Sequence, residues 1–307
     1  MSRGFWRAVQ VILAVAILFF VGLEFWRNWE EVRSTPLVWT PRPGLLLLSA
    51  GVTWVMYGLL IAAWRGFLVA WRQPIGAIQA ARIWSLSNLG KYVPGKVWAI
   101  AGMAVMARQA GVAAWAATAS AILLQGLAIG TGAFVVGITA SDVLETAWPG
   151  TRLVLWILAL ASAIGVGALV SPGTLRLVLR RFVPDQTIPR PGAGTIGFGI
   201  LANLTAWGGY GLAFWLMSRG LLPETPLTLL VAVGAFTASY LAGFLALLAP
   251  GGLGVREAVF VLILQGSVGL TAAAALAVAS RVLLTLTEVG IAVPFLVHSS
   301  RGSVRTT

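Results

Sequence analysis

Residues 112–139 read VAAWAATASAILLQGLAIGTGAFVVGIT and carry no charged side chain. A transmembrane helix needs about 20 mostly apolar residues, so this stretch is long enough to cross a bilayer. Similar apolar runs occur on both sides of it along the 307-residue chain. We therefore predict an all-α fold, a polytopic transmembrane helical bundle of seven or eight spans that forms a single integral membrane domain over residues 1–307. The predicted full spans lie near residues 8–27, 44–64, 112–139, 151–170, 196–217, 227–248 and 270–297.

The composition agrees with a membrane protein and argues against most enzyme classes. Hydrophobic residues make up 59% of the chain and charged residues 10%, against roughly 25% charged in soluble domains. The lack of cysteine excludes a disulfide scaffold and a thiolate metal site. The two aspartates, Asp142 and Asp185, lie in different polar connections, so they do not form a paired metal site. A transporter or scaffold is favoured over an enzyme, and we expect no metal and no cofactor.

The charge balance indicates orientation in the membrane. Lysine and arginine number 21 against 9 acidic residues, a formal net charge of +12. In so apolar a chain this surplus points to the positive-inside rule rather than to nucleic-acid binding. By this rule, the connections at 65–108 and 171–190 and the N-terminus lie in the cytoplasm, because they carry many basic residues, Arg3 and Arg7 among them. Three arginines on the first outer connection, Arg27, Arg33 and Arg42, argue against this orientation. We expect a multi-pass protein of the cytoplasmic (inner) membrane whose first span is an uncleaved signal anchor.

Two segments combine Pro, Gly and charge inside apolar sequence: residues 92–98, YVPGKVW, and residues 249–258, APGGLGVREA. Each has the form of a helix stopped at Pro-Gly with a basic residue near the start of the next helical piece. The piece 97–107 is too short to cross a hydrocarbon core. We therefore predict re-entrant or broken helices at about 74–108 and 249–267, one in each half of the chain, as an internal pseudo-repeat would leave them.

Broken helices at membrane depth are suited to binding an anion, because the N-terminal N–H groups of a helix are unpaired and carry positive charge. The alternative interpretation is a tight turn between two antiparallel spans. The basic side chains beside both breaks favour a binding site for a phosphate group. The predicted substrate-binding residues are Lys91, Tyr92, Pro94, Gly95, Lys96, Gly251, Gly252 and Arg256.

A second prediction concerns the charges at membrane depth. Only Glu257 and Glu288 among the acidic residues lie in apolar surroundings, and Arg281 lies seven residues before Glu288, on the same helix face. Seven residues correspond to about 10 Å along a helix, too far for a close pair. We expect Glu257 to pair with Arg281, and Arg256 with Glu288, in a charge network. The alternative is an ion network that only holds the bundle together.

At these residues the chain resembles a known family. The segment 89–98 (LGKYVPGKVW), the segment 250–258 (PGGLGVREA) and the later Arg281 and Glu288 are similar to the lysylphosphatidylglycerol synthase transmembrane-region family. The resemblance implies a flippase-like helical bundle with re-entrant segments. It is related to the flippase half of the multiple peptide resistance factor, which moves aminoacylated phosphatidylglycerol between leaflets. After the last predicted span we find only residues 299–307 and no aminoacyltransferase domain, so lysyl transfer by this chain is not expected.

The leading hypothesis is a flippase or transporter of a phosphate-bearing lipid, with a membrane phospholipid or a polyprenyl-linked lipid as its partner. No P-loop is present, so movement would be downhill or coupled to an ion gradient. One alternative is a non-catalytic membrane subunit for a lipid-modifying glycosyltransferase or aminoacyltransferase. An intramembrane enzyme with Glu257 or Glu288 as general base is disfavoured by the missing metal ligands and nucleophile. A partner enzyme and a homo-oligomer are both left open.

Overall fold

The computed structural model describes residues 37, 39–92, 98–141, 145, 149–171, 173–174, 177, 180, 191–246 and 249–302. All regular secondary structure in these ranges is helical, so the predicted all-α class is confirmed. The predicted span at 8–27 lies outside the described residues.

Six long helices occupy the six predicted spans that can be compared. Four of them are long and apolar enough to cross a membrane: the helices at Pro43–Ala70, Ala114–Thr139 and Thr151–Leu169, and the last helix over Leu270–Leu296. The shortest, α11, has 17 residues. At most helix ends, the predicted and the observed boundaries differ by a few residues. The helices are α3 (Pro43–Ala70), α6 (Ala114–Thr139), α8 (Thr151–Leu169), α10 (Ala193–Leu221), α11 (Leu229–Leu245) and α13 (Leu270–Gly302).

Local chemistry explains where several of these helices begin. Helix α3 starts at Pro43, whose missing N–H costs nothing in the first turn. The Thr228 hydroxyl caps α11 by accepting from the backbone N–H of Val231. At the start of α8 the Glu145 carboxylate accepts from the N–H groups of Gly150 and Arg152, and these hydrogen bonds lower the pKa of this exposed carboxyl. Polar groups thus mark the helix ends that the apolar pattern predicts.

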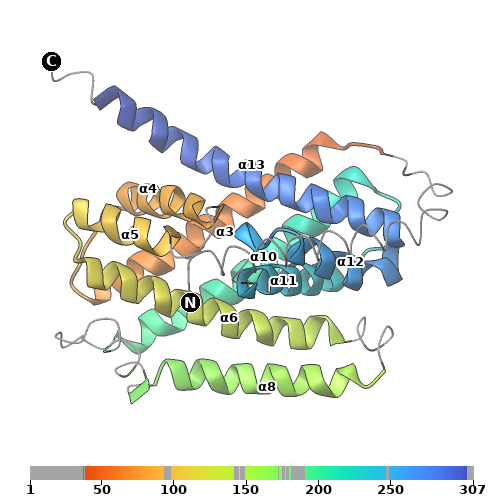
Figure 1. Ribbon diagram of the computed structural model, residues 1–307, viewed down its shortest axis with the longest axis horizontal. Coiled ribbons are helices and arrows are strands. Elements are labelled where there is room, and N and C mark those ends of the chain that lie inside the picture. Colours follow the sequence, from red (N-terminus) through yellow and green to blue (C-terminus); the bar gives the residue numbers. More distant parts are fainter. Residues whose placement is uncertain are drawn as a thin grey trace, which may run out of the picture.

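The first predicted break lies between two short helices, α4 (Ala77–Asn88) and α5 (Trp98–Gln109). Each has 12 residues, about 18 Å at 1.5 Å per residue, which is little more than half of a hydrocarbon core. A 3₁₀ turn, η1 (Leu89–Tyr92), ends the first arm. The two arms lie side by side (Figure 1). The interruption is therefore confirmed, and its insertion into a membrane from one side stays a prediction.

The second break follows α11. A 3₁₀ turn, η2 (Pro250–Gly252), leads into α12 (Val255–Val268), which packs against both α11 and α13. Gly269, with a φ of 80°, turns the chain from α12 into α13. Helix α12 is again shorter than a full span, as predicted.

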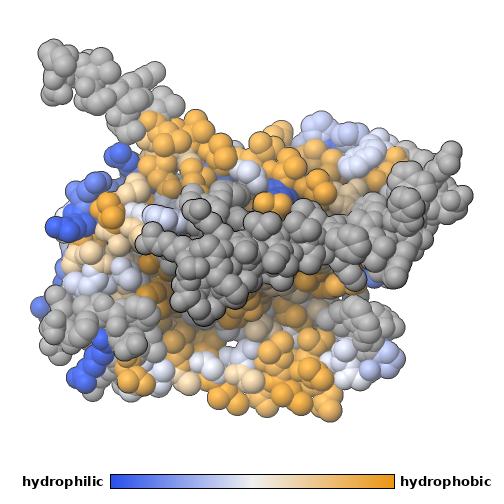
Figure 2. Space-filling view, in the orientation of Figure 1, coloured by the Kyte–Doolittle hydropathy of each residue, from blue (hydrophilic) through white to orange (hydrophobic). Residues whose placement is uncertain are grey.

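Helix α13 connects the two halves of the bundle. It packs against α3 and α4 on one side of the break region and against α12 on the other (Figure 1). The indole N–H of Trp54 on α3 donates to the carbonyl of Thr287 on α13 at 3.0 Å. Hydrophobic side chains cover much of the visible surface along α8 and α13 (Figure 2), as expected for helices that face lipid. The inner face of α13 is where the polar groups collect.

Candidate functional site

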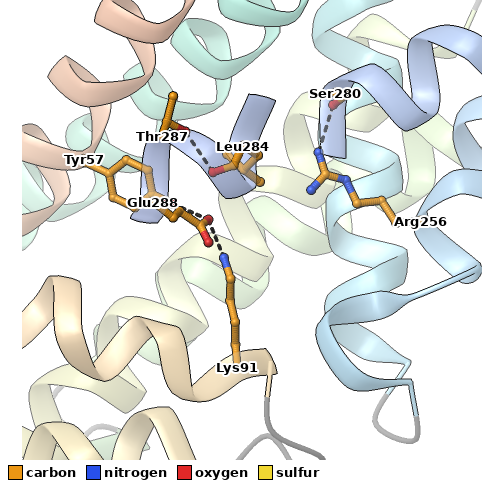
Figure 3. Close-up of polar contacts among 7 residues, drawn as sticks. All are labelled: Tyr57, Lys91, Arg256, Ser280, Leu284, Thr287 and Glu288. Atoms are coloured by element: carbon orange, nitrogen blue, oxygen red, sulfur yellow. Dashed lines mark hydrogen bonds and ion pairs between the residues drawn. The ribbon is translucent and has the colours of Figure 1, made fainter. Parts of the chain in front are cut away.

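The first break places Lys91 against the last helix. Lys91 lies in η1, and its Nζ is 2.5 Å from Oε1 of Glu288 on α13 (Figure 3). The Lys91 side chain is 22% exposed, whereas Glu288 is 2% exposed. A carboxylate buried this deeply needs a cation or hydrogen-bond donors to offset its lost hydration. Lys91 supplies the cation from the more accessible side.

Tyr57 contributes a second donor to the same carboxylate. Its hydroxyl donates to Oε1 of Glu288, and its ring packs edge-on against Tyr210. Tyr57 comes from α3, so three elements that are remote in sequence meet at Glu288 (Figure 3). Because the tyrosine is neutral, it can keep its hydrogen bond to Glu288 whether or not the lysine is in place.

The second break is built from glycines in the left-handed region. Gly251, Gly252 and Gly254 have φ values of 56°, 71° and 80°. A Cβ on Gly252 would lie 2.7 Å from the Cα of Gly243 on α11. Only glycine satisfies both the conformation and this approach of two backbones. The Pro-Gly-Gly pattern therefore has a direct structural reason.

Arg256 follows this break in the first turn of α12 and is buried, with 6% exposure. Its Nη2 donates to the hydroxyl of Ser280 on α13 at 3.1 Å (Figure 3). The guanidinium lies 5.1 Å from the ring centre of Phe236, 5.6 Å from that of Tyr240 and 5.7 Å from that of Phe260. Such cation–π contacts partly replace the lost hydration of a buried cation. Its contacts within the described chain are thus neutral.

The predicted pairing of Glu257 with Arg281 is confirmed. Nη1 of Arg281 is 2.6 Å from Oε1 of Glu257, and both side chains are partly exposed. The other oxygen of Glu257 accepts from the backbone N–H of Gly254 at 2.8 Å. Glu257 therefore caps α12 and also ties its first turn to α13.

The predicted pairing of Arg256 with Glu288 is wrong. Arg256 binds Ser280, and Glu288 binds Lys91 and Tyr57. Ser280 and Glu288 are eight residues apart on α13, about 12 Å along the axis, so each break meets the helix at its own level. The cation that reaches Glu288 comes from the first half of the chain because η1 lies beside α13.

The side chain of Tyr92 and residues Pro94, Gly95 and Lys96 lie outside the described residues. Gly251 and Gly252 are placed as backbone of η2, which contacts η1. The two predicted breaks are therefore adjacent in space, although they lie far apart in the sequence.

Sequence reasoning singled out Tyr92 and missed the other three tyrosines. The chain has four, and Tyr57, Tyr210 and Tyr240 all line one cavity of about 170 Å³ beside the break region. Tyrosines in membrane proteins favour the interfaces, so tyrosines in the middle of apolar spans are unusual. This unusual position was the signal in the sequence that could have pointed to the cavity. The same cavity is lined by Asn203 and Gln125, polar groups at depth that sequence alone could not assign to a site.

The arrangement combines two cations, a buried carboxylate and a cavity next to interrupted helices. These groups suit the binding of a polar, phosphate-bearing headgroup inside a membrane protein. Within the described ranges no cluster of three or more acidic or histidine side chains could hold a metal ion.

Residues 7–290 match the family model described as Lysylphosphatidylglycerol synthase TM region. A comparison with curated proteins finds no match to the chain. The family match covers most of the sequence and includes both breaks.

Proposed function

The chain belongs to the lysylphosphatidylglycerol synthase TM-region family, and we propose that it works as a flippase for a phosphate-bearing lipid of the cytoplasmic membrane. The observation that carries the proposal is the meeting of the two interrupted helices beside α13. Each break places one cation against α13, Lys91 or Arg256, at levels about 12 Å apart along that helix. Irregular backbone and charge are tolerated at membrane depth where they line a substrate pathway.

Lys91 is the exchangeable cation of the pair. Its side chain is more accessible than that of Glu288, so a phosphate can approach it from outside the bundle. Phosphate and carboxylate are both strong partners for an ammonium group and would compete for it. When the phosphate takes Lys91, Glu288 keeps the hydrogen bond from Tyr57. The carboxylate therefore keeps a hydrogen-bond donor when the ion pair opens, but its negative charge is no longer balanced by Lys91.

Arg256 is the fixed cation. The described contacts of its guanidinium are a hydroxyl and three rings, whereas Glu257 and Glu288 act on its charge electrostatically without a contact. A charge in a low-dielectric region attracts an anion over a longer distance than one in water. Arg256 would thus draw the phosphate toward the break region, and Lys91 would bind it.

Energy coupling follows from the same exchange. A carboxylate that has lost its cation in a buried position is stabilised by taking a proton. Release of Lys91 from Glu288 would therefore couple headgroup passage to protonation of Glu288. A protein without this coupling would move the lipid down its concentration gradient only.

The test measures movement of fluorescent phosphatidylglycerol and of fluorescent polyprenyl phosphate between leaflets of reconstituted vesicles. We expect Lys91→Gln and Arg256→Glu to slow translocation at least tenfold, about 1.4 kcal/mol in the barrier. Arg82→Gln is the matched control, because Arg82 is an exposed residue of α4. Wild-type rates in folded Arg256→Glu protein would overturn the proposal. Covalent change of the lipid would instead indicate an enzyme, and neither movement nor chemistry would indicate a non-catalytic subunit.

A further inference from the structure

The cavity beside the break region has one aromatic wall. Tyr57, Tyr210, Phe236, Tyr240 and Trp207 follow one another in ring contact, with centroid distances of 5.6–6.1 Å. All five side chains line the cavity of about 170 Å³. Aromatic rings at the surface of a pocket provide flat apolar faces against which a ligand ring can stack.

The rest of the cavity offers neutral hydrogen-bonding groups. Asn88 on α4, Gln125 on α6 and Asn203 on α10 line it. Asn203 donates to the carbonyl of Gly199 at 2.8 Å, which leaves its amide oxygen as an acceptor. The amides of Asn88 and Gln125, like the hydroxyls of Tyr210 and Tyr240, make no hydrogen bond with the described part of the chain. These four groups carry both donors and acceptors that face a space able to hold a ligand.

The charges around the cavity argue against a charged occupant. Arg256 already lies over the rings of Phe236 and Tyr240, so a second cation against this wall would meet a like charge. Glu288, which contacts the cavity residue Tyr57, is engaged by Lys91 and Tyr57. No lysine or arginine is among the described residues that line the cavity, so an anion finds no direct counter-charge there. An uncharged ligand with many hydroxyl groups fits this lining.

We propose that this cavity binds an uncharged, hydroxyl-rich headgroup, that is, a sugar attached to the lipid phosphate. The inference rests on the proposed flippase function and names its substrate class, a lipid-linked sugar phosphate. The sugar ring stacks on the aromatic wall, and its hydroxyls exchange hydrogen bonds with Asn88, Gln125 and Asn203.

The chain geometry agrees with a sugar and a phosphate bound side by side. Asn88 is the last residue of α4, and Lys91 follows it within η1. A headgroup whose sugar reaches Asn88 therefore has its phosphate near Lys91. The small side chains of Ala99, Ala128 and Ala206 line the same cavity and leave its volume open.

The experiment compares two lipid types in reconstituted vesicles. One is fluorescent polyprenyl phosphate, and the other is the same lipid carrying glucose, mannose or N-acetylglucosamine on the phosphate. Translocation is measured for the wild type, for Gln125→Leu, which removes the amide with little change in volume, and for Ala206→Leu, which fills the cavity. Gln79→Leu is the matched control, because Gln79 is exposed on α4 and outside the cavity lining. Equilibrium binding of the same lipids to protein in nanodiscs is the second readout.

We expect at least one sugar-bearing lipid to bind and move about tenfold better than the bare phosphate. Gln125→Leu and Ala206→Leu should abolish that preference, whereas the control Gln79→Leu should keep it. Equal handling of all lipids by wild type and variants would overturn the sugar site while leaving the flippase proposal standing. Sugar-lipid binding that depends on Gln125, without any translocation, would support the site and overturn the flippase proposal. If no sugar-bearing lipid binds or moves, the sugar site is overturned.

Discussion

The two breaks of this protein share a Pro-Gly pattern and differ in how each holds its cation. At the first break, Lys91 is partly exposed and paired with a carboxylate of α13. At the second, Arg256 is buried among rings and a hydroxyl, behind glycine backbone that packs against α11. Similar sequence signals thus give an accessible ion pair in one half and an enclosed cation in the other.

This difference indicates which of the two cations could change partners and which could not. An ammonium group bound to one carboxylate can change partners at small cost when a competing anion arrives. A guanidinium held against three rings and packed backbone has no comparable alternative position. In the proposed flippase mechanism, the α4–α5 side is therefore the moving part and the α11–α12 side is the fixed one.

The largest effect is expected from breaking the backbone packing of the second region. Gly252→Ala puts a Cβ 2.7 Å from the Cα of Gly243 and forces alanine to a φ of 71°. We expect a loss of about 2–4 kcal/mol in stability, measured by thermal unfolding of the purified protein. Gly266→Ala on α12, where a Cβ meets nothing within 4 Å, should not destabilise. Equal behaviour of the two variants would refute the rigid-framework interpretation.

A smaller loss is expected at the first break. Lys91→Met removes a cation from Glu288, which is 2% exposed, and should cost about 2 kcal/mol. The value is below that of a fully buried pair because Lys91 is partly exposed. Adding Glu288→Gln removes the charge that needs the cation, so the double variant should unfold at a higher temperature than Lys91→Met alone. Additive losses in this double-mutant cycle would show that the pair is not coupled.

The smallest change in stability is expected for Arg256→Met. This variant best distinguishes the role of the second cation from that of Lys91. The neutral partners of Arg256 leave no orphan charge when it is replaced, and methionine fills a similar volume among the rings. Stability should stay within about 1 kcal/mol of the wild type, whereas translocation in vesicles should fall at least tenfold. A destabilisation equal to that of Lys91→Met would mean that the two cations play the same structural part.

Much of the fold was predictable because its cause is local. Uninterrupted apolar length predicted α3, α6, α8, α10, α11 and α13 where the structure has them. Pro-Gly pairs beside charge predicted both interruptions, and the left-handed glycines of η2 explain the second. The pairing of Glu257 with Arg281 was also predictable, from the scarcity of charges at depth.

The partners of Glu288 were not predictable in this way. Tyr57 and Lys91 lie 231 and 197 residues away along the chain, and no periodicity links such positions. The prediction paired Glu288 with Arg256, the basic residue beside the second break. In the structure, Lys91 of η1 makes the contact with Glu288 instead.

The sequence by itself therefore determined that this is a helical membrane protein with two broken helices and few charges at depth, since apolar length, Pro-Gly and charge scarcity act locally. Only the tertiary structure decided which cation meets which partner and that three tyrosines share one cavity with three amides. The physical reason is that a buried charge or amide is satisfied by whichever helix packs next to it, and helix packing depends on the shapes of all the faces at once.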